Sequence, residues 1–88
     1  MAWTIEVSAA AERDLRKLDR QAARRIRDFL RDRIASAANP RAIGQATSGP
    51  PAGYWRYRVG DHRILCAIED RRVTVLVIRI GHRGDVYR

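Results

Sequence analysis

The chain lacks the features that define several large classes of protein. Cys66 is its only cysteine, which excludes an internal disulfide and a zinc site built from cysteines. No hydrophobic run approaches the roughly 20 residues that a membrane-spanning helix needs. The first residues have neither the charged start nor the apolar middle of a secretory signal. We therefore expect a soluble, cytoplasmic protein that makes no membrane contact.

Catalytic motifs with a fixed local pattern are also missing. The sequence has no glycine-rich phosphate-binding loop followed by Lys-Ser or Lys-Thr, and no Ser-His-Asp set of a known spacing. Its two histidines, His62 and His82, are too few for a convincing metal centre, so we expect no metal and no cofactor. With 88 residues, 1–88 forms one domain, too short for a dinucleotide-binding fold or a repeat array.

Positive charge is what the sequence has in excess. Lys and Arg together number 18 against 10 Asp and Glu, which gives a net charge of +8. Lys17 is the one lysine, so the other basic residues are arginines, whose guanidinium groups match phosphate and carboxylate oxygens. A codon bias would produce the same preference for arginine. The charge suits a polyanionic partner, which is a nucleic acid, an acidic protein or an anionic membrane surface.

The N-terminal half has one strand-like and two helix-like patterns. Alternation over residues 3–8 predicts a half-buried strand. Apolar stripes at helical spacing predict two helices within residues 9–37, and Ser8 and Asp19 suit their N-caps. Residues 38–53 contain all three prolines of the chain and several glycines, so they predict a long loop.

The C-terminal half is strand-like. Apolar and alternating runs predict three strands, at residues 54–59, 63–68 and 73–80. Gly60-Asp61 fits a tight hairpin turn between the first two. The order β-α-α-β-β-β predicts an α+β fold in which a helical hairpin packs on a twisted, mostly antiparallel sheet.

The first of these strands has two different faces. One face carries side chains that we expect in the core, Trp55, Tyr57 and Val59. The other face carries Tyr54, Arg56 and Arg58. Arginines on one face of a sheet, with aromatic rings between them, form a groove for a phosphodiester chain and its bases. The same face would also suit an acidic peptide.

Two further arginines lie inside predicted strands. Arg63 shares its face with Leu65, which is an unusual place for a cation unless it meets an anion or a carboxylate, and we favour a functional role. Arg79 has the same parity as Val75 and Val77. We interpret Arg79 as structural, paired with a buried acid such as Glu6 or Glu69.

Three residues near the end of the chain are candidates for function. His82 titrates in the range that suits acid–base catalysis, although a lone histidine is more often a packed or surface residue. Arg83 is flanked by Gly81 and Gly84 and should be exposed. Tyr87 has no core to join unless the tail folds back, and this favours a functional role.

Three segments together resemble the RelE/ParE superfamily of bacterial toxins. Leu-Arg-Lys-Leu-Asp at 15–19 is similar to the signature of the first helix. Residues 53–64, Gly-Tyr-Trp-Arg-Tyr-Arg-Val-Gly-Asp-His-Arg-Ile, resemble the middle RelE motif. Residues 73–87, from Val-Thr-Val-Leu-Val to Gly-Asp-Val-Tyr, resemble the C-terminal motif. The resemblance covers nearly the whole chain and implies a RelE-like microbial RNase fold.

The resemblance implies a toxin of a type II toxin–antitoxin system. RelE-like toxins are metal-independent endonucleases that cut mRNA in the ribosomal A site and so inhibit translation. The 2′-hydroxyl attacks the adjacent phosphate and leaves a 2′,3′-cyclic phosphate and a free 5′-hydroxyl. ParE-like toxins share the scaffold and inhibit DNA gyrase without RNase activity, which is the alternative function.

Matching the motifs position by position implies roles for single residues. Arg63 matches a transition-state stabiliser, Arg83 matches the arginine that assists the leaving group, and Tyr87 matches the tyrosine that orients the substrate. Arg56 and Tyr54 stand where well-studied members have lysines.

These two differences leave the general base open. Arginine hardly deprotonates, so the base is His82, Tyr54 or water. We expect Arg58 to contribute to RNA binding.

The resemblance also implies partners. We expect a RelB-like antitoxin with an acidic segment that covers Arg63 or Arg83 and folds on binding. The ribosome and its mRNA are the expected targets. Operator DNA is expected as a partner only through the complex with the antitoxin.

Overall fold

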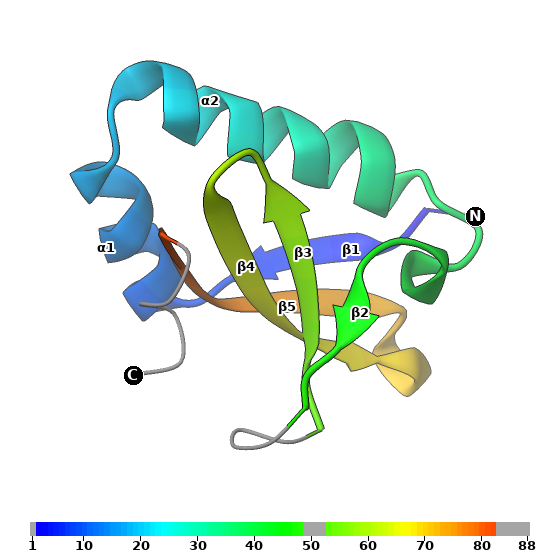
Figure 1. Ribbon diagram of the computed structural model, residues 1–88. Helices are drawn as coiled ribbons and strands as arrows, with labels where there is room; N and C mark the ends of the chain where they lie inside the picture. Colours follow the sequence, from blue (N-terminus) through cyan, green and yellow to red (C-terminus); the bar gives the residue numbers. More distant parts are fainter. Residues whose placement is uncertain (1, 49–52, 83–88) are drawn as a thin grey trace.

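The computed structural model describes residues 2–48 and 53–82. In them, two α-helices pack against a five-stranded sheet (Figure 1). The helices are α1 (Ala9–Lys17) and α2 (Arg20–Phe29). The strands are β1 (Thr4–Val7), β2 (Gln45–Ala46), β3 (Trp55–Val59), β4 (His62–Glu69) and β5 (Thr74–His82). The predicted α+β fold, with a helical hairpin on a sheet, is confirmed.

The sheet has the order β1-β5-β4-β3-β2. Only the β1–β5 pair is parallel, and the other three pairs are antiparallel, as the sequence predicts. The prediction of an uninterrupted loop over 38–53 is wrong in one place, since β2 adds an edge strand beside β3. The indole N–H of Trp55 donates to the carbonyl oxygen of Ile43 at 2.7 Å and holds this segment against β3. A strand this short leaves no periodic signal in the sequence.

Both helices begin where their capping residues predict. The Ser8 hydroxyl accepts a hydrogen bond from the Ala11 amide at 3.0 Å, and the Asp19 carboxylate accepts one from the Ala22 amide at 2.8 Å. Each bond satisfies an amide that the first helical turn leaves without a partner. After α2 the chain continues as a π-helical segment, Leu30–Ala35, so the second helix ends close to the predicted boundary. Within the described ranges, no helix is long and apolar enough to cross a membrane.

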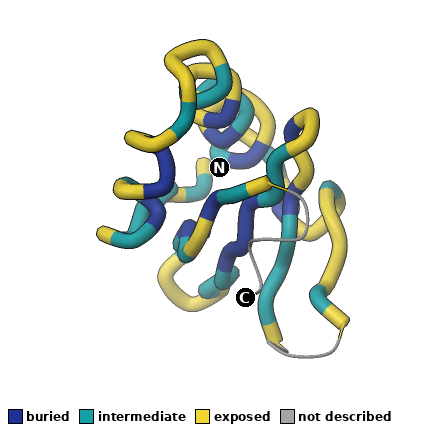
Figure 2. The backbone as a smooth tube through the Cα atoms, turned by 60° about the vertical axis from the view of Figure 1, so that its left-hand side comes forward, coloured by how far each residue is buried: buried dark blue, intermediate teal, exposed yellow. Residues whose placement is uncertain are grey.

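The core lies between the helices and one face of the sheet. Figure 2 shows buried residues on the sides of the helices and strands that face each other, and exposed residues on the outer turns. Tyr57 is fully buried, Val59 is nearly so, and Trp55 packs against them, which confirms the predicted core face of β3. The Tyr57 hydroxyl donates to the Pro40 carbonyl at 2.7 Å, so burying this phenol leaves no unsatisfied donor.

A β-bulge changes the face on which Arg79 lies. Leu65 pairs with Arg79, but the next residue, Cys66, pairs with Val77, so β5 has one extra residue at this point. Because side chains alternate along a strand, the extra residue moves Arg79 to the face opposite Val77. The sequence parity that grouped Arg79 with Val75 and Val77 is therefore wrong for the folded chain.

Candidate functional site

The sheet face away from the core carries a groove rich in arginine. Arg58 of β3 lies directly opposite Arg63 of β4, and Arg56 lies opposite Gln45 of β2. Residues opposite each other in an antiparallel pair project from the same face. The groove has a volume of about 260 Å³, and we call it the arginine groove; its lining residues are Gly44, Gln45, Arg56, Tyr57, Arg58 and Arg63.

Arg63 has a buried nitrogen with no partner. Its Nη1 atom is inaccessible to solvent and has no hydrogen-bond acceptor in the part of the chain that the structure describes. Leaving a buried donor unsatisfied costs about 1–3 kcal/mol, and more for a charged group. Arg58 opposite adds a second positive charge on the same face. An anion in the groove would satisfy the donor and reduce the repulsion, so the geometry favours an anionic ligand.

Arg56 is oriented by a neutral side chain. Its Nη2 donates to the Gln45 Oε1 at 2.9 Å across the β2–β3 pair. The amide fixes the direction of the guanidinium without cancelling its charge. Among the described residues, no carboxylate forms an ion pair with Arg56, Arg58 or Arg63. The groove therefore keeps its positive charge.

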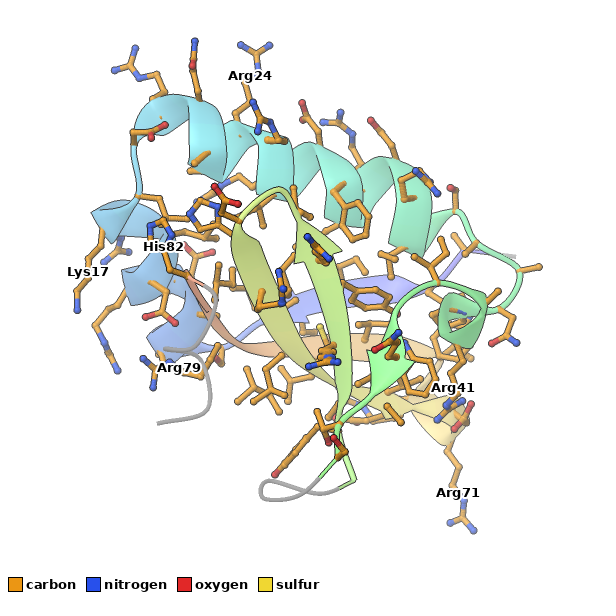
Figure 3. All side chains as sticks on the ribbon, in the orientation of Figure 1. Lys17, Arg24, Arg41, Arg71, Arg79 and His82 are labelled. Carbon is orange, nitrogen blue, oxygen red and sulfur yellow. The ribbon has the colours of Figure 1, made fainter. Side chains whose placement is uncertain are left out.

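Other arginines of the sheet and its turns are paired with acids. Arg41 donates to both carboxylate oxygens of Asp70, at 2.8 and 2.9 Å, and Arg72 bonds to Glu6 and Glu69. Figure 3 shows Arg41 beside the turn before β5, far from the end of the sheet that carries His82. This contrast shows that the positive charge of the groove is not a general property of the molecule's arginines.

Arg79 has the structural role that its sequence predicts, with a different partner. Its Nε and Nη2 donate to Asp14 of α1 at 2.9 and 3.3 Å, and the Ile80 amide donates to the same carboxylate at 2.9 Å. Burial alone would raise the pKa of Asp14, but these hydrogen bonds outweigh it and hold the pKa below the ordinary value. The predicted partners Glu6 and Glu69 are wrong, since both bind Arg72 instead.

Tyr54 lies just before β3, on the groove's side of the sheet. The Thr47 amide donates to the Tyr54 carbonyl oxygen at 3.0 Å, which extends the pairing of β2 and β3 by one position. Alternation along the strand then puts Tyr54 on the same face as Arg56 and Arg58. The structure thus brings together four of the residues that the sequence singled out, Tyr54, Arg56, Arg58 and Arg63.

His82 lies on the other face of the sheet. It is opposite His62, with the ring centroids 4.5 Å apart, and both rings are on the side that carries the helices. Burial lowers the pKa of His62, and the neighbouring His82 adds to this effect, so His62 is neutral at pH 7. Figure 3 shows His82 near Lys17, at the α1 end of the sheet. The structure does not bring His82 to the arginine groove, and its acid–base role stays a prediction.

Two predicted site residues, Arg83 and Tyr87, lie outside the described residues, and their roles stay predictions. Gln45 is the groove residue that the sequence reasoning missed, because its position became meaningful only when β2 paired with β3. Gly44 beside it has a φ of +80°, and a Cβ there would collide with the backbone oxygen of Arg56. A glycine in a predicted loop was the one available sign of this close approach.

Comparison with known proteins places these features in context. A family model described as the ParE toxin of a type II toxin–antitoxin system, parDE, matches residues 5–87. The chain is 31% identical over 88 residues to Toxin RelG of Mycobacterium tuberculosis, covering 100% of this chain and 99% of that protein. It is 30% identical over 86 residues to Toxin RelE of the same organism, covering 98% and 87%.

Solved structures give the same fold. The chain superimposes on a chain of the toxin–antitoxin complex RelBE2 from Mycobacterium tuberculosis with a TM-score of 0.85 and 28% identity, covering 97% of this chain and 95% of that one. The isolated E. coli RelE toxin gives a TM-score of 0.72 at 21% identity, covering 98% and 92%. The second likeness concerns the fold alone.

Proposed function

The chain belongs to the RelE/ParE superfamily of toxins from type II toxin–antitoxin systems, and from this premise we propose that it is a ribosome-dependent endoribonuclease. It cuts mRNA in the ribosomal A site, without a metal ion, and thereby inhibits translation in the cytoplasm. The observation that carries the proposal is the buried, unpartnered Nη1 of Arg63 in a groove that also holds Arg56 and Arg58. A phosphodiester is an anion of suitable shape for such a groove.

The chemistry asks for charge stabilisation at one phosphate. The 2′-oxygen forms a bond to phosphorus while the bond to the 5′-oxygen breaks, which gives a 2′,3′-cyclic phosphate and a free 5′-hydroxyl. Negative charge builds on the nonbridging oxygens as the phosphorus becomes five-coordinate. Arg63 and Arg58, opposite each other, hold these oxygens, and fixed donors of this kind lower the barrier without reorganisation.

The proton of the attacking 2′-hydroxyl needs an acceptor. Arginine stays protonated, which removes Arg56 from this role. Burial raises the pKa of the Tyr57 phenol far above its ordinary value, and that phenol is committed to Pro40. Tyr54 is the remaining ionisable side chain on the groove's face among the described residues, so we assign it to the proton, directly or through a water. Arg83 completes the site at the leaving oxygen and Tyr87 orients the nucleotide.

Purified protein and programmed ribosomes test the cleavage. We expect mRNA ends that map to the A site at substoichiometric toxin, with cyclic phosphate termini. Arg63→Ala should slow cleavage by about 100- to 1000-fold, by analogy with the loss of one oxyanion donor. Arg24→Ala is the matched control, because Arg24 projects outward from α2 (Figure 3). An uncut message, or full cleavage by Arg63→Ala, would overturn the proposal.

The antitoxin is the second part of the proposed function. We propose that it is a RelB-like protein with an acidic segment that covers Arg63 or Arg83, and that operator DNA is bound only through their complex. The net charge of +8 supports an acidic partner. Relatives of this chain were solved as toxin–antitoxin complexes, RelBE2 of Mycobacterium tuberculosis among them.

A second candidate function follows from the family model, whose description names the ParE toxin. In this alternative, the chain inhibits DNA gyrase by binding it and cuts no RNA. A supercoiling assay separates the two functions. Gyrase inhibition with intact mRNA would select the alternative, whereas A-site cleavage with normal supercoiling would select the endoribonuclease.

A further inference from the structure

The free edge of β1 carries unused backbone hydrogen-bonding groups. The amides of Thr4 and Ser8 donate to Val73 and Val77 of β5, at 2.9 Å each. Alternate residues of a parallel strand bond to the same neighbour, so Ile5 and Val7 direct their N–H and C=O groups away from the sheet. The amide of Trp3 points the same way and donates to the Ala35 carbonyl at 2.8 Å, which covers only the start of the edge.

An apolar groove runs beside this edge. It has a volume of about 230 Å³, lies between β1 and the second helix, and is lined by Ile5, Val7, Arg27, Leu30, Arg31 and Ala35. Proteins usually protect a free strand edge with a proline, a bulge or an inward-pointing charge, and β1 has none of these. Open backbone groups next to an apolar groove fit a polypeptide in extended conformation, which could use both.

We propose that an extended segment of the antitoxin adds to β1 as a sixth strand of the sheet. Its backbone bonds to Ile5 and Val7, and every second side chain enters the groove against Leu30 and Ala35. Apolar side chains at these positions, followed by an acidic one that reaches Arg27, match the chemistry of the lining. Arg27 has room for such a partner, since its one carboxylate neighbour, Glu12, is 3.7 Å away.

Charge argues against a second copy of this chain as the occupant. Two copies joined at β1 would bring together chains of net charge +8 each. They would also place Arg27 and Arg31 of one copy near those of the other. An acidic segment has the opposite charge, and the sheet would gain a strand without repulsion. The inference rests on the proposed antitoxin partnership and is independent of RNA cleavage.

Amide exchange in the complex gives the most direct test. The probe is the antitoxin encoded beside this chain, co-expressed and purified with the isotope-labelled toxin. The exchange of the Ile5 and Val7 amides should slow by at least about 100-fold on binding. The Thr4 and Glu6 amides, already bonded to β5 in the free chain, should change little. Fast exchange at Ile5 and Val7 in a stoichiometric complex would overturn the inference.

Two variants test the same surface by affinity. Val7→Pro removes one outward N–H and leaves the ladder to β5 intact, and Ala35→Glu puts a carboxylate into the groove. Each should weaken antitoxin binding by at least about tenfold, with Arg24→Ala as the unchanged control. Thermal melting identifies a variant that fails to fold, and Ala35→Glu then decides.

The outcomes separate the possible failures. Unchanged binding by folded variants would overturn the docking site alone. No complex at all would also remove the antitoxin partnership. Slow Ile5 and Val7 exchange in the free chain, together with a dimer in sedimentation, would assign the edge to a second copy and overturn the inference.

Discussion

Arg58 and Arg63 lie directly opposite each other on β3 and β4, with both guanidinium groups on the open face of the sheet. Like charges at opposite positions of an antiparallel pair destabilise the sheet, by up to about 1 kcal/mol. The buried Nη1 of Arg63 adds the cost of an unsatisfied donor. The site is therefore held ready for an anion at the expense of the stability of the free fold.

The first prediction is that Arg63→Met makes the free protein more stable and less active. Methionine fills similar space without a charge or a donor. We expect the free energy of unfolding to rise by about 1 kcal/mol, which for a domain of this size raises the Tm by roughly 4–8 °C. Cleavage on the ribosome should be lost. Thermal unfolding and the cleavage assay measure the two effects.

Phosphate provides the control for this prediction. Added phosphate should raise the Tm of the natural protein more than that of Arg63→Met, because only the first has the buried donor. Arg63→Lys should keep part of the response, since it keeps the charge without the guanidinium fork. A lower Tm for Arg63→Met would show that the arginine stabilises the fold, and the interpretation of the groove would be wrong.

The second prediction concerns Gln45, which orients Arg56 through one hydrogen bond of 2.9 Å. Gln45→Ala should slow cleavage by roughly tenfold, as expected when a bond of about 1.4 kcal/mol is lost from the transition state. Gln45→Glu keeps the bond but neutralises the charge of Arg56, so it should be at least as slow while the Tm stays the same or rises. A purely structural role would not give this combination.

The matched control is Gln21→Ala, at an exposed glutamine of α2. Single-turnover rates at saturating ribosome concentration separate an effect on chemistry from one on binding. If Gln45→Glu cleaves like the natural protein, the charge of Arg56 is not used, and Gln45 has no positioning role.

The order of the elements and the two faces of β3 could be predicted from the sequence. Strict alternation over Trp55–Val59 separates apolar from basic side chains, and the turn at Gly60 then fixes the register that brings Arg63 opposite Arg58. Local patterns of this kind are set by neighbours in the sequence. The predicted grouping of Tyr54, Arg56, Arg58 and Arg63 depended on nothing further.

Features that depend on pairing between distant segments could not be predicted. The bulge opposite Leu65 and Cys66 inverts the parity of β5 and gives Arg79 to Asp14, and no run of residues records it. Gln45 became part of the groove only when β2 paired with β3. The buried Nη1 of Arg63 is likewise a property of packing rather than of composition.

The third prediction concerns stability at low pH. The pKa of Asp14 in the folded protein lies below its ordinary value of 3.8. A lowered folded pKa means that the carboxylate stabilises the fold above pH 3.8, and that this contribution is lost as the pH falls through the folded pKa. Asp14→Asn should therefore lower the free energy of unfolding by about 1–2 kcal/mol at pH 7, because asparagine keeps the bond to Ile80 but loses the charge facing Arg79.

Unfolding by urea at several pH values measures this effect. The difference between the natural protein and Asp14→Asn should be constant near neutral pH and should shrink below pH 3.8. Asp70→Asn serves as the comparison, because the pKa of Asp70 is also lowered by an arginine, although its side chain is exposed. Exposed pairs contribute little, so its effect should be smaller. A difference that stays constant to pH 2 would contradict the assigned pKa shift.

The last prediction concerns Val73, which has a left-handed backbone with a φ of +49°. A β-branched side chain rarely adopts this conformation, which costs about 1–2 kcal/mol. The turn is imposed from both sides, since the Val73 amide donates to Asp70 at 3.1 Å and its carbonyl accepts from Thr4 at 2.9 Å. Asparagine tolerates the left-handed region, so Val73→Asn should raise the Tm by several degrees. Val73→Ala is the control, because it shortens the side chain without that tolerance. A lower Tm for Val73→Asn than for Val73→Ala would mean that the packing of the valine outweighs its backbone strain.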